Sequence, residues 1–367
     1  MIPGPFLVAG AAAPRAFGYS APQVKNLVRI RTCPALTQSA QRFSFVSMSA
    51  NSTESSKTDS HWATGGEIPG SGGIHAFTLS GPVPSAIPVL IAVPHGGRAY
   101  PRSLLERMRN PGFAALRLED RYVDLLAADI AAATGASLLI ANAPRAMIDL
   151  NRAADDIDWD MFGCGAPPDV GSYTPGRRAR SGLGLIPRRL PGIGELWKRR
   201  HDEQDLAARI CDIHEPYHAA LDAELTALRD RWGAALLLDL HSMPPLVLRG
   251  AQPPPEFVLG DRFGTSCHGG LVGSSFAYFA EMRRGAAHNR PYAGGYVLER
   301  HAAPGEGLHA LQLEVDRSSY LDSRMTEPGK GFAAIGHLLA GLVRRLAAEV
   351  ATLGRMRPSS DWAEAAE

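Results

Sequence analysis

The sequence predicts an α/β protein: a single three-layer domain with a mainly parallel mixed sheet and helices on both faces. Four short apolar runs have the length of buried strands rather than of helices. Segments with apolar residues at helical spacing lie between these runs, and strands that alternate with helices form mainly parallel sheets. Ligands bind such sheets beyond the carboxyl ends of the strands, so a functional site is expected there. The four runs are residues 87–93, 136–141, 234–238 and 309–315.

Composition excludes several classes of function. The chain has 367 residues, of which 45% are hydrophobic, so one large core can form. Its 38 Lys and Arg residues nearly balance 37 Asp and Glu residues, so there is no overall field to attract nucleic acid or an anionic membrane. No apolar run approaches the roughly 20 residues of a transmembrane helix. The cysteines have no paired spacing, which favours a reducing compartment; they are Cys33, Cys164, Cys211 and Cys267.

The catalytic domain is expected at residues 74–355, followed by a polar tail at 356–367. Residues 1–73 are expected to be a disordered or transit-like extension, because they are basic and contain no acidic residue as far as Thr53. A start at Met48 is a further alternative. A cytoplasmic location is expected, with organelle targeting as the alternative.

The first half of the domain contains two expected helices and a long loop. Residues 75–79 alternate as a strand does, and residues 101–109 form a short predicted helix. A longer helix is expected at 116–134, with Asp120 on one of its sides. Regular patterns are absent from 153 to 200. So long a loop is uncommon within a domain unless it is functional, and we expect a lid or a substrate wall.

The second half contains the strongest helix signal. Residues 201–232 carry apolar side chains at steps of three and four, which predicts a long amphipathic helix, bent or divided at Pro216. The remaining predicted elements are strands at 257–261 and 294–297 and helices at 274–284 and 330–353.

Two histidines suggest a metal site. His95 and His241 each follow a buried strand, and neutral imidazole is a good zinc ligand. A catalytic zinc has three protein ligands, and the third is expected to be a carboxylate, either Asp120 or its neighbour Glu119. One zinc per chain is expected, although another divalent transition metal could replace it. If the histidines share one ion, their ring nitrogens must lie within about 6 Å of each other.

A carboxylate on a later strand could serve as a base. Alternation along this strand places Gln312, Glu314 and Asp316 on one side. Beside a metal, Glu314 could take a proton from an attacking water and relay it. The alternative is an ion-paired strand end without a catalytic role.

Arginines recur near the expected strand ends and in the Gly-rich loop. Guanidinium groups bind carboxylates and stabilise oxyanions, so several in one pocket would indicate an anionic substrate. Asn151 and Arg152 are expected directly after a strand, where a binding role is favoured. Exposed surface arginines are the alternative, which we expect for Arg177, Arg178 and Arg180. The arginines expected near a site are Arg145, Arg152, Arg188 and Arg317.

Short motifs follow in order along the chain. They are Pro94-His95-Gly96-Gly97, Glu119-Asp120-Arg121-Tyr122-Val123-Asp124, Arg145 with Asp149-Leu150-Asn151-Arg152, Ser181-Gly182-Leu183-Gly184-Leu185-Ile186-Pro187-Arg188, His214-Glu215-Pro216-Tyr217-His218, Asp239-Leu240-His241-Ser242-Met243-Pro244, Asn289-Arg290-Pro291-Tyr292, and Ala310-Leu311-Gln312-Leu313-Glu314 with Arg317. With these motifs, residues 93–322 resemble the N-formylglutamate amidohydrolase family.

The resemblance implies an activity and a fold. The family hydrolyses N-formyl-L-glutamate to formate and L-glutamate in histidine breakdown, and it is similar in fold to zinc carboxypeptidases. One departure concerns the metal ligands. Zinc carboxypeptidases have a glutamate three residues after the first histidine, where this chain has Arg98. The carboxylate ligand must therefore come from elsewhere, and Asp120 is preferred.

The resemblance also implies roles for individual residues. His95 and His241 would hold zinc, and Glu314 would be the base. Substrate carboxylates would be bound by Asn151, Arg152 and Arg145, with Arg317 and Tyr292 as further binding residues from matching motifs, while Arg188 would stabilise the oxyanion.

The expected ligand is therefore a small anionic N-acyl amino acid, and neither nucleic acid nor membrane is expected as a partner. A metallo-carboxypeptidase, another N-acyl amino acid deacylase and a metal-free binding module for acidic amino acids are the alternatives. The sequence does not predict an oligomeric state.

Overall fold

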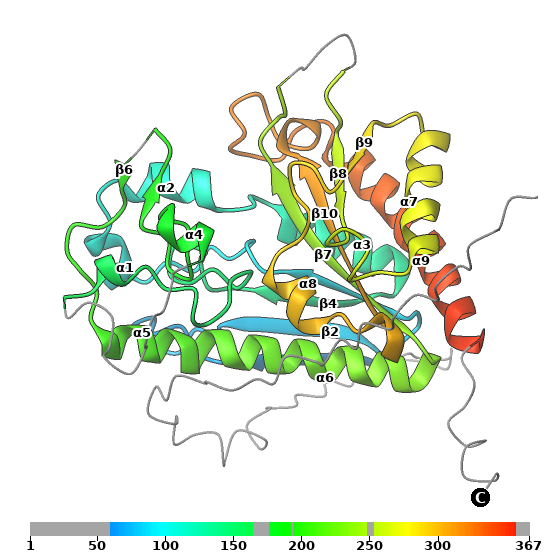
Figure 1. Ribbon diagram of the computed structural model, residues 1–367, viewed down its shortest axis with the longest axis horizontal. Coiled ribbons are helices and arrows are strands. Elements are labelled where there is room, and N and C mark those ends of the chain that lie inside the picture. The colour runs from blue at the N-terminus through cyan, green and yellow to red at the C-terminus, as the bar shows by residue number, and fades with distance from the viewer. Residues whose placement is uncertain (1–58, 164–175, 193, 248–252, 357–367) are drawn as a thin grey trace, which may run out of the picture.

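The computed structural model describes residues 59–163, 176–192, 194–247 and 253–356. An eight-stranded sheet runs through this part of the chain, and helices pack on both of its faces (Figure 1). The predicted three-layer α/β architecture is therefore confirmed. None of the helices in these ranges has the length and apolar content that a membrane crossing needs.

The sheet has a parallel centre with antiparallel additions. Its order is β1-β2-β4-β3-β7-β10-β8-β9, and the four neighbours β4, β3, β7 and β10 run parallel. β1 and β2 join one side as antiparallel strands, and β8 pairs antiparallel with β10 on the other. The strands are β1 (Asp59–Gly65), β2 (Phe77–Val83), β3 (Val89–Val93), β4 (Ser137–Ala141), β7 (Ala235–Met243), β8 (Phe257–Gly260), β9 (Ala286–His288) and β10 (Leu308–Asp316).

The central strands are buried on both faces, as is typical of parallel sheets covered by helices. Every residue of β3 and β7 is buried. Polar residues enter β7 only towards its carboxyl end, where the parallel register sets Glu314 of β10 opposite His241. The sheet thus fixes these two side chains beside each other before any loop contributes.

Each face of the sheet has its own helical layer and its own apolar core. Figure 1 shows the long α6 along one side, with α3, α7 and α9 on the other. The predicted helix 201–232 is confirmed, and a π-helical turn just before Pro216 is the expected disturbance. The main helices are α3 (Val123–Thr134), α5 (Glu203–Arg209), the π-helical turn (Ile210–His214), α6 (Glu215–Trp232), α7 (Gly269–Glu281) and α9 (Phe332–Met356).

Short elements connect these layers. They include the strands β5 (Arg189–Leu190) and β6 (Gly194–Glu195), the helices α1 (Arg102–Arg107), α2 (Pro111–Leu118), α4 (Arg177–Arg180) and α8 (Tyr296–His301), and 3-10 turns at Trp159–Met161, Pro304–Glu306 and Arg317–Ser319.

The expected domain boundary at residue 74 lies too late in the chain. β1, at Asp59–Gly65, is an edge strand of the main sheet and pairs with β2 along its full length. Main-chain hydrogen bonds hold such a strand, so its polar sequence gave little sign of it. Residues 1–58 and 357–367, which carry most of the expected extension and tail, are outside the described residues.

The expected helix 116–134 is wrong in one respect that matters for function. α2 ends at Leu118 and α3 begins at Val123, and the link contains an extended Glu119 and a left-handed Tyr122. A tertiary contact accounts for the break, because the Asp120 amide donates to the His95 carbonyl at 3.0 Å. Asp120 is therefore on a link and not on a helix.

Two other expectations are corrected. Residues 294–297 were expected to be a strand, but α8 begins at Tyr296, and its Val297 amide donates to the side chain of Asn151 at 2.9 Å. This remote cap cannot be seen in local sequence. Residues 147–152 contain no strand, and turns occupy 147 and 150–151, so Asn151 and Arg152 do not directly follow a strand.

Candidate active site

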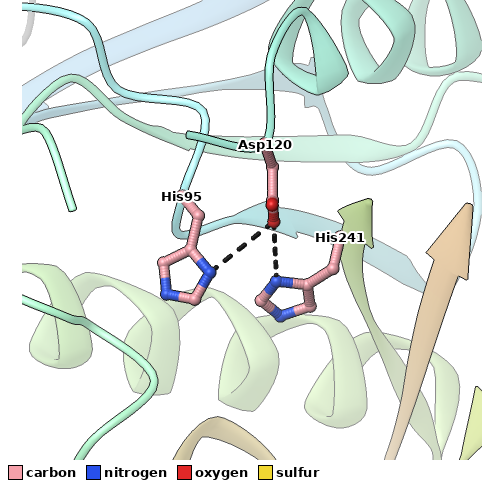
Figure 2. A group of neighbouring side chains, drawn as sticks. All are labelled: His95, Asp120 and His241. Atoms are coloured by element: carbon pink, nitrogen blue, oxygen red, sulfur yellow. Dashed lines mark hydrogen bonds and ion pairs between the residues drawn. The ribbon is translucent and has the colours of Figure 1, made fainter. Parts of the chain in front are cut away.

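Three buried side chains converge near the carboxyl ends of β3 and β7. His95 lies two residues after β3, His241 lies within β7, and Asp120 is on the α2–α3 link. One ligand atom from each lies within 4.8 Å of the other two. Asp120 Oδ2 is 3.6 Å from His95 Nδ1 and 3.0 Å from His241 Nδ1 (Figure 2). The 6 Å limit for a shared ion is met.

Further carboxylates orient both histidine rings. His95 Nε2 lies 2.7 Å from Asp149 Oδ1, and His241 Nε2 lies 2.9 Å from Asp239 Oδ2. An ionised carboxylate only accepts, so each Nε2 carries a hydrogen and each Nδ1 is turned towards Asp120. Without a metal, His241 Nδ1 also carries a hydrogen and donates it to Asp120. Carboxylates on the outer nitrogen commonly fix the tautomer of metal-binding histidines.

The donor set fits a divalent transition metal. With its hydrogen on Nε2, the buried Nδ1 of His95 has a lone pair and no hydrogen-bond partner among the described residues. A buried polar atom without a partner is costly, and a metal ion would remove that cost. Two imidazoles and a carboxylate are a ligand set that zinc accepts, and three protein ligands leave a position open for reactants.

Asp120, and not Glu119, is the carboxylate that the fold presents to the histidines. Glu119 Oε2 pairs with Arg121 Nη1 at 3.0 Å instead. Burial opposes the charge of Asp120, but the hydrogen bond from His241 and the nearby His95 ring outweigh it and hold its pKa well below the usual range. Arg317 donates to Asp120 Oδ1 at 3.0 Å and supports the same ionised form.

The position expected to hold a glutamate in a carboxypeptidase has a separate role. Arg98 makes two hydrogen bonds to Asp124, at 2.7 and 2.6 Å, and is not in the ligand group. The departure noted in the sequence is thus accommodated by an ion pair beside the site.

Glu314 lines the same cavity as the three candidate ligands. Burial raises its pKa to about 7, with Asp120 adding to the rise and His241 opposing it. Gln312, two residues earlier on the same side of β10, donates to Glu314 Oε1 at 2.9 Å. A carboxyl group with a pKa near neutrality can both accept and return a proton. Asp316 does not share this role, because it caps the 3-10 turn that follows β10.

The cavity has a volume of about 920 Å³. It brings together most of the residues expected from the sequence. Arg188 is the exception, since it does not line the cavity and pairs with Asp158 at 2.7 Å. The expected residues that do line it are His95, Asp120, Arg145, Asn151, Arg152, His241, Tyr292, Glu314 and Arg317.

The cavity arginines differ in how many of their hydrogen-bond donors already have partners within the protein. Arg317 donates to Ser242, to the Glu119 carbonyl and to Asp120, so its donors support a candidate ligand. Arg145 contacts Asp149 at 2.9 Å; burial works against its charge, but Asp149 outweighs burial and raises its pKa.

Two arginines at the rim were not expected. Arg117 and Arg178 line the cavity and are exposed, and neither has an ion-pair partner within the described ranges. Arg178 was expected to be an ordinary surface residue. Arg178 lines the cavity together with Leu183 and Leu190 of the same connection, 153–200. Its place at the cavity follows from the fold of this connection and not from a local sequence pattern. Part of the connection that was expected to be a lid or a substrate wall thus lines this cavity, while its residues 164–175 fall outside the described residues.

Comparison with known proteins agrees with this arrangement. The family model described as N-formylglutamate amidohydrolase matches residues 87–321. A protein named N-formylglutamate deformylase from Pseudomonas aeruginosa is 29% identical over 74% of this chain and 95% of its own. Its namesake from Pseudomonas putida is 32% identical over 66% of this chain and 84% of its own.

Solved structures give the same result. The N-formylglutamate amidohydrolase of Ralstonia eutropha JMP134 is 33% identical, with a TM-score of 0.68, and the match covers 76% of this chain and 99% of that one. A gene product of Agrobacterium tumefaciens shares the fold at 18% identity, with a TM-score of 0.52 over 75% of this chain and 96% of its own. The family match spans most of the chain and includes all three candidate ligands, so the chain belongs to the N-formylglutamate amidohydrolase family.

Proposed function

We propose that this protein hydrolyses N-formyl-L-glutamate to formate and L-glutamate, using one zinc or another divalent transition metal held by His95, Asp120 and His241. The observation that carries the proposal is the placement of these ligands and of Glu314 in one arginine-lined cavity. The names of the two Pseudomonas relatives support the choice of substrate. A cytoplasmic location is proposed with it.

A bound divalent ion would supply Lewis acidity that polarises the formyl carbonyl and makes an attacking water more acidic. Glu314 takes a proton from that water as its oxygen bonds to the carbonyl carbon. The carbon–nitrogen bond then breaks, and Glu314 returns the proton to the amine nitrogen. Its pKa of about 7 suits both transfers.

Arg145, Asn151, Arg152 and Tyr292 are the proposed substrate-binding residues, since all four line the cavity. Guanidinium groups bind carboxylates through paired hydrogen bonds, which suits a substrate with two acidic groups. Arg317 was expected in this group, but its contacts assign it to the support of Asp120. The oxyanion role expected for Arg188 passes to Arg145, because Arg188 lies outside the cavity lining.

The decisive experiment combines metal content with a substrate panel. The purified protein is expected to contain about one equivalent of zinc and to lose turnover when a chelator removes it. N-formyl-L-glutamate should be turned over faster than N-acetyl-glutamate, N-succinyl-glutamate or a peptide with a C-terminal glutamate. Preference for the peptide would favour a carboxypeptidase, and binding without turnover would favour a binding module.

Glu314→Gln tests the assignment of the base. The amide keeps the shape of the side chain but cannot accept the proton, so kcat should fall about 10²–10⁴-fold while zinc content is unchanged. His337→Gln, an exposed substitution on α9, is the control. Full turnover by Glu314→Gln would contradict the mechanism.

A further inference from the structure

A second histidine pair, His214 and His218, has the H-E-x-x-H spacing that places two zinc ligands on one face of a helix in other proteins. Here the Nε2 atom of each ring faces a main-chain carbonyl. His214 Nε2 is 2.9 Å from the Arg152 carbonyl, and His218 Nε2 is 3.1 Å from the Leu150 carbonyl. Both rings are buried, and the proposed reaction uses neither of them.

The regular helical hydrogen bonding is interrupted beside this pair. Pro216 has no amide hydrogen, so the Asp212 carbonyl is left without that helical partner and accepts from the Glu67 amide at 3.0 Å. The π-helical turn Ile210–His214 lies directly before this point, and such turns are frequent at functional sites. The two ring centroids are 4.4 Å apart.

The segment that the histidines hold is the outer support of the candidate metal ligands. Asp149 contacts His95 at 2.7 Å, and the Asn151 side-chain amide lies 3.4 Å from His241 Nε2. Between and after these residues come the carbonyls of Leu150 and Arg152. Holding those two carbonyls therefore fixes Asp149, which accepts from His95 Nε2, and Asn151, whose side chain packs beside His241.

Hydrogen bonds set the direction of this support. A carbonyl only accepts, so His218 carries its hydrogen on Nε2 and, being neutral, accepts at Nδ1. His301 Nε2, 2.8 Å away, must then donate, and its Nδ1 must also donate because it faces the Asp222 carboxylate. The rings of His218 and His301 stack at 5.1 Å and 16°.

The surrounding charges agree with this assignment. Burial, with His214, His301 and Arg300 adding to it, holds the pKa of His218 well below its usual range, so His218 is neutral. Arg300 lies 3.8 Å from the second oxygen of Asp222. Asp222 is 52% exposed, so the chain of hydrogen bonds starts at the surface and ends behind the active site.

We propose that His214 and His218 are positioning residues: they hold the Arg152 and Leu150 carbonyls and thereby keep Asp149 and Asn151 against the ligand histidines, while Asp222 and His301 fix the tautomer of His218. This inference rests on the proposed metal-dependent function.

The first test measures metal affinity and does not depend on turnover. Metal-free protein is titrated with zinc against a competing chromophoric chelator. His218→Leu, which cannot donate to Leu150, should bind zinc about 10–100-fold more weakly. His218→Gln can still donate to that carbonyl and accept from His301, so it should recover most of the affinity. His337→Gln serves as the control for replacing a histidine.

The second test reads the tautomers by long-range ¹⁵N–¹H spectra of histidine-labelled protein. His214 and His218 should carry hydrogen on Nε2, and His301 on both nitrogens. Asp222→Asn can donate to His301 Nδ1, so it should remove the hydrogen from that nitrogen and keep zinc affinity. Asp222→Ala should lower that affinity.

The outcomes separate the two proposals. A folded His218→Leu variant with wild-type zinc affinity, or a His218 with hydrogen on Nδ1, would overturn the positioning role. If His218→Leu does not fold, equal zinc affinity in Asp222→Ala and wild type would overturn it. If the wild-type protein does not hydrolyse N-formyl-L-glutamate, but His218→Leu still binds zinc more weakly than wild type, the proposed substrate would be rejected and the positioning role kept.

Discussion

Two histidine pairs contact the segment 149–152, and only one of them forms a possible ligand group with a carboxylate of the described residues. The rings of His95 and His241, with centroids 4.8 Å apart, have carboxylates on their outer nitrogens. Their inner nitrogens are directed at Asp120. The ring centroids of His214 and His218 are slightly closer, at 4.4 Å, but the Nε2 atoms of these rings face carbonyls.

The comparison shows that spacing in the sequence does not decide which histidines lie together with a carboxylate as a possible metal site. His214 and His218 match a zinc motif, whereas His95 and His241 are 146 positions apart. What differs is the group at the other ring nitrogen. Asp120 Oδ2 lies 3.6 Å from His95 Nδ1 and 3.0 Å from His241 Nδ1, which completes a group of three possible ligands. Nδ1 of His218 faces His301 instead, and within the described residues no carboxylate completes such a group with His214 and His218.

The largest expected effect comes from removing a ligand. His241→Gln should bring bound zinc from about one equivalent to none and lower turnover at least about a thousandfold, because the Lewis acid is lost. The matched variant His214→Gln keeps a donor for the Arg152 carbonyl and should retain one equivalent. Elemental analysis after gel filtration measures both. Zinc lost only from His214→Gln would reverse the assignment of the two pairs.

A smaller effect is expected from pH. Burial opposes the charge of His241, but Asp239 and Asp120 outweigh it and raise its pKa well above the usual range, so the metal-free form is protonated at neutral pH. Zinc must displace that proton, so its affinity should rise with pH, by up to about tenfold per pH unit between pH 6 and 8.

The second pair sharpens this prediction. Burial lowers the pKa of His214 to about 4, so this ring is already neutral across that range and adds no slope. Competition titrations at fixed ionic strength measure the zinc affinity at each pH. An affinity that is flat from pH 6 to 8 would mean that no ligand proton is displaced.

Much of the site could be predicted from the sequence because its chemistry lies on regular strands. The apolar runs locate β3 and β7, and a parallel sheet brings their carboxyl ends together, so His95 and His241 could be paired. Strand alternation likewise placed Glu314 on the side that lines the cavity.

The rest depends on tertiary contacts that local patterns do not contain. Asp120 was expected on a helix, but the His95 carbonyl holds its amide on a link. Arg178 was expected to be a surface residue, and only the fold of its connection brings it to the cavity. Arg188 has a side chain suited to binding an anion, yet its ion pair with Asp158 keeps it out of the cavity lining.

The smallest of these effects concerns Asp120, the expected ligand that tertiary contacts distinguish from its neighbour Glu119. Arg317 donates to Asp120 Oδ1 at 3.0 Å and to the Glu119 carbonyl, so it holds the link that carries the carboxylate. Arg317→Gln should weaken zinc binding about tenfold, because outer support costs less than a ligand, and the zinc-saturated variant should keep most of its kcat. Competition titration and kinetics at saturating zinc separate the two quantities. If KM for N-formyl-L-glutamate rises while zinc affinity is unchanged, Arg317 binds substrate and Asp120 is held by its histidine contacts alone.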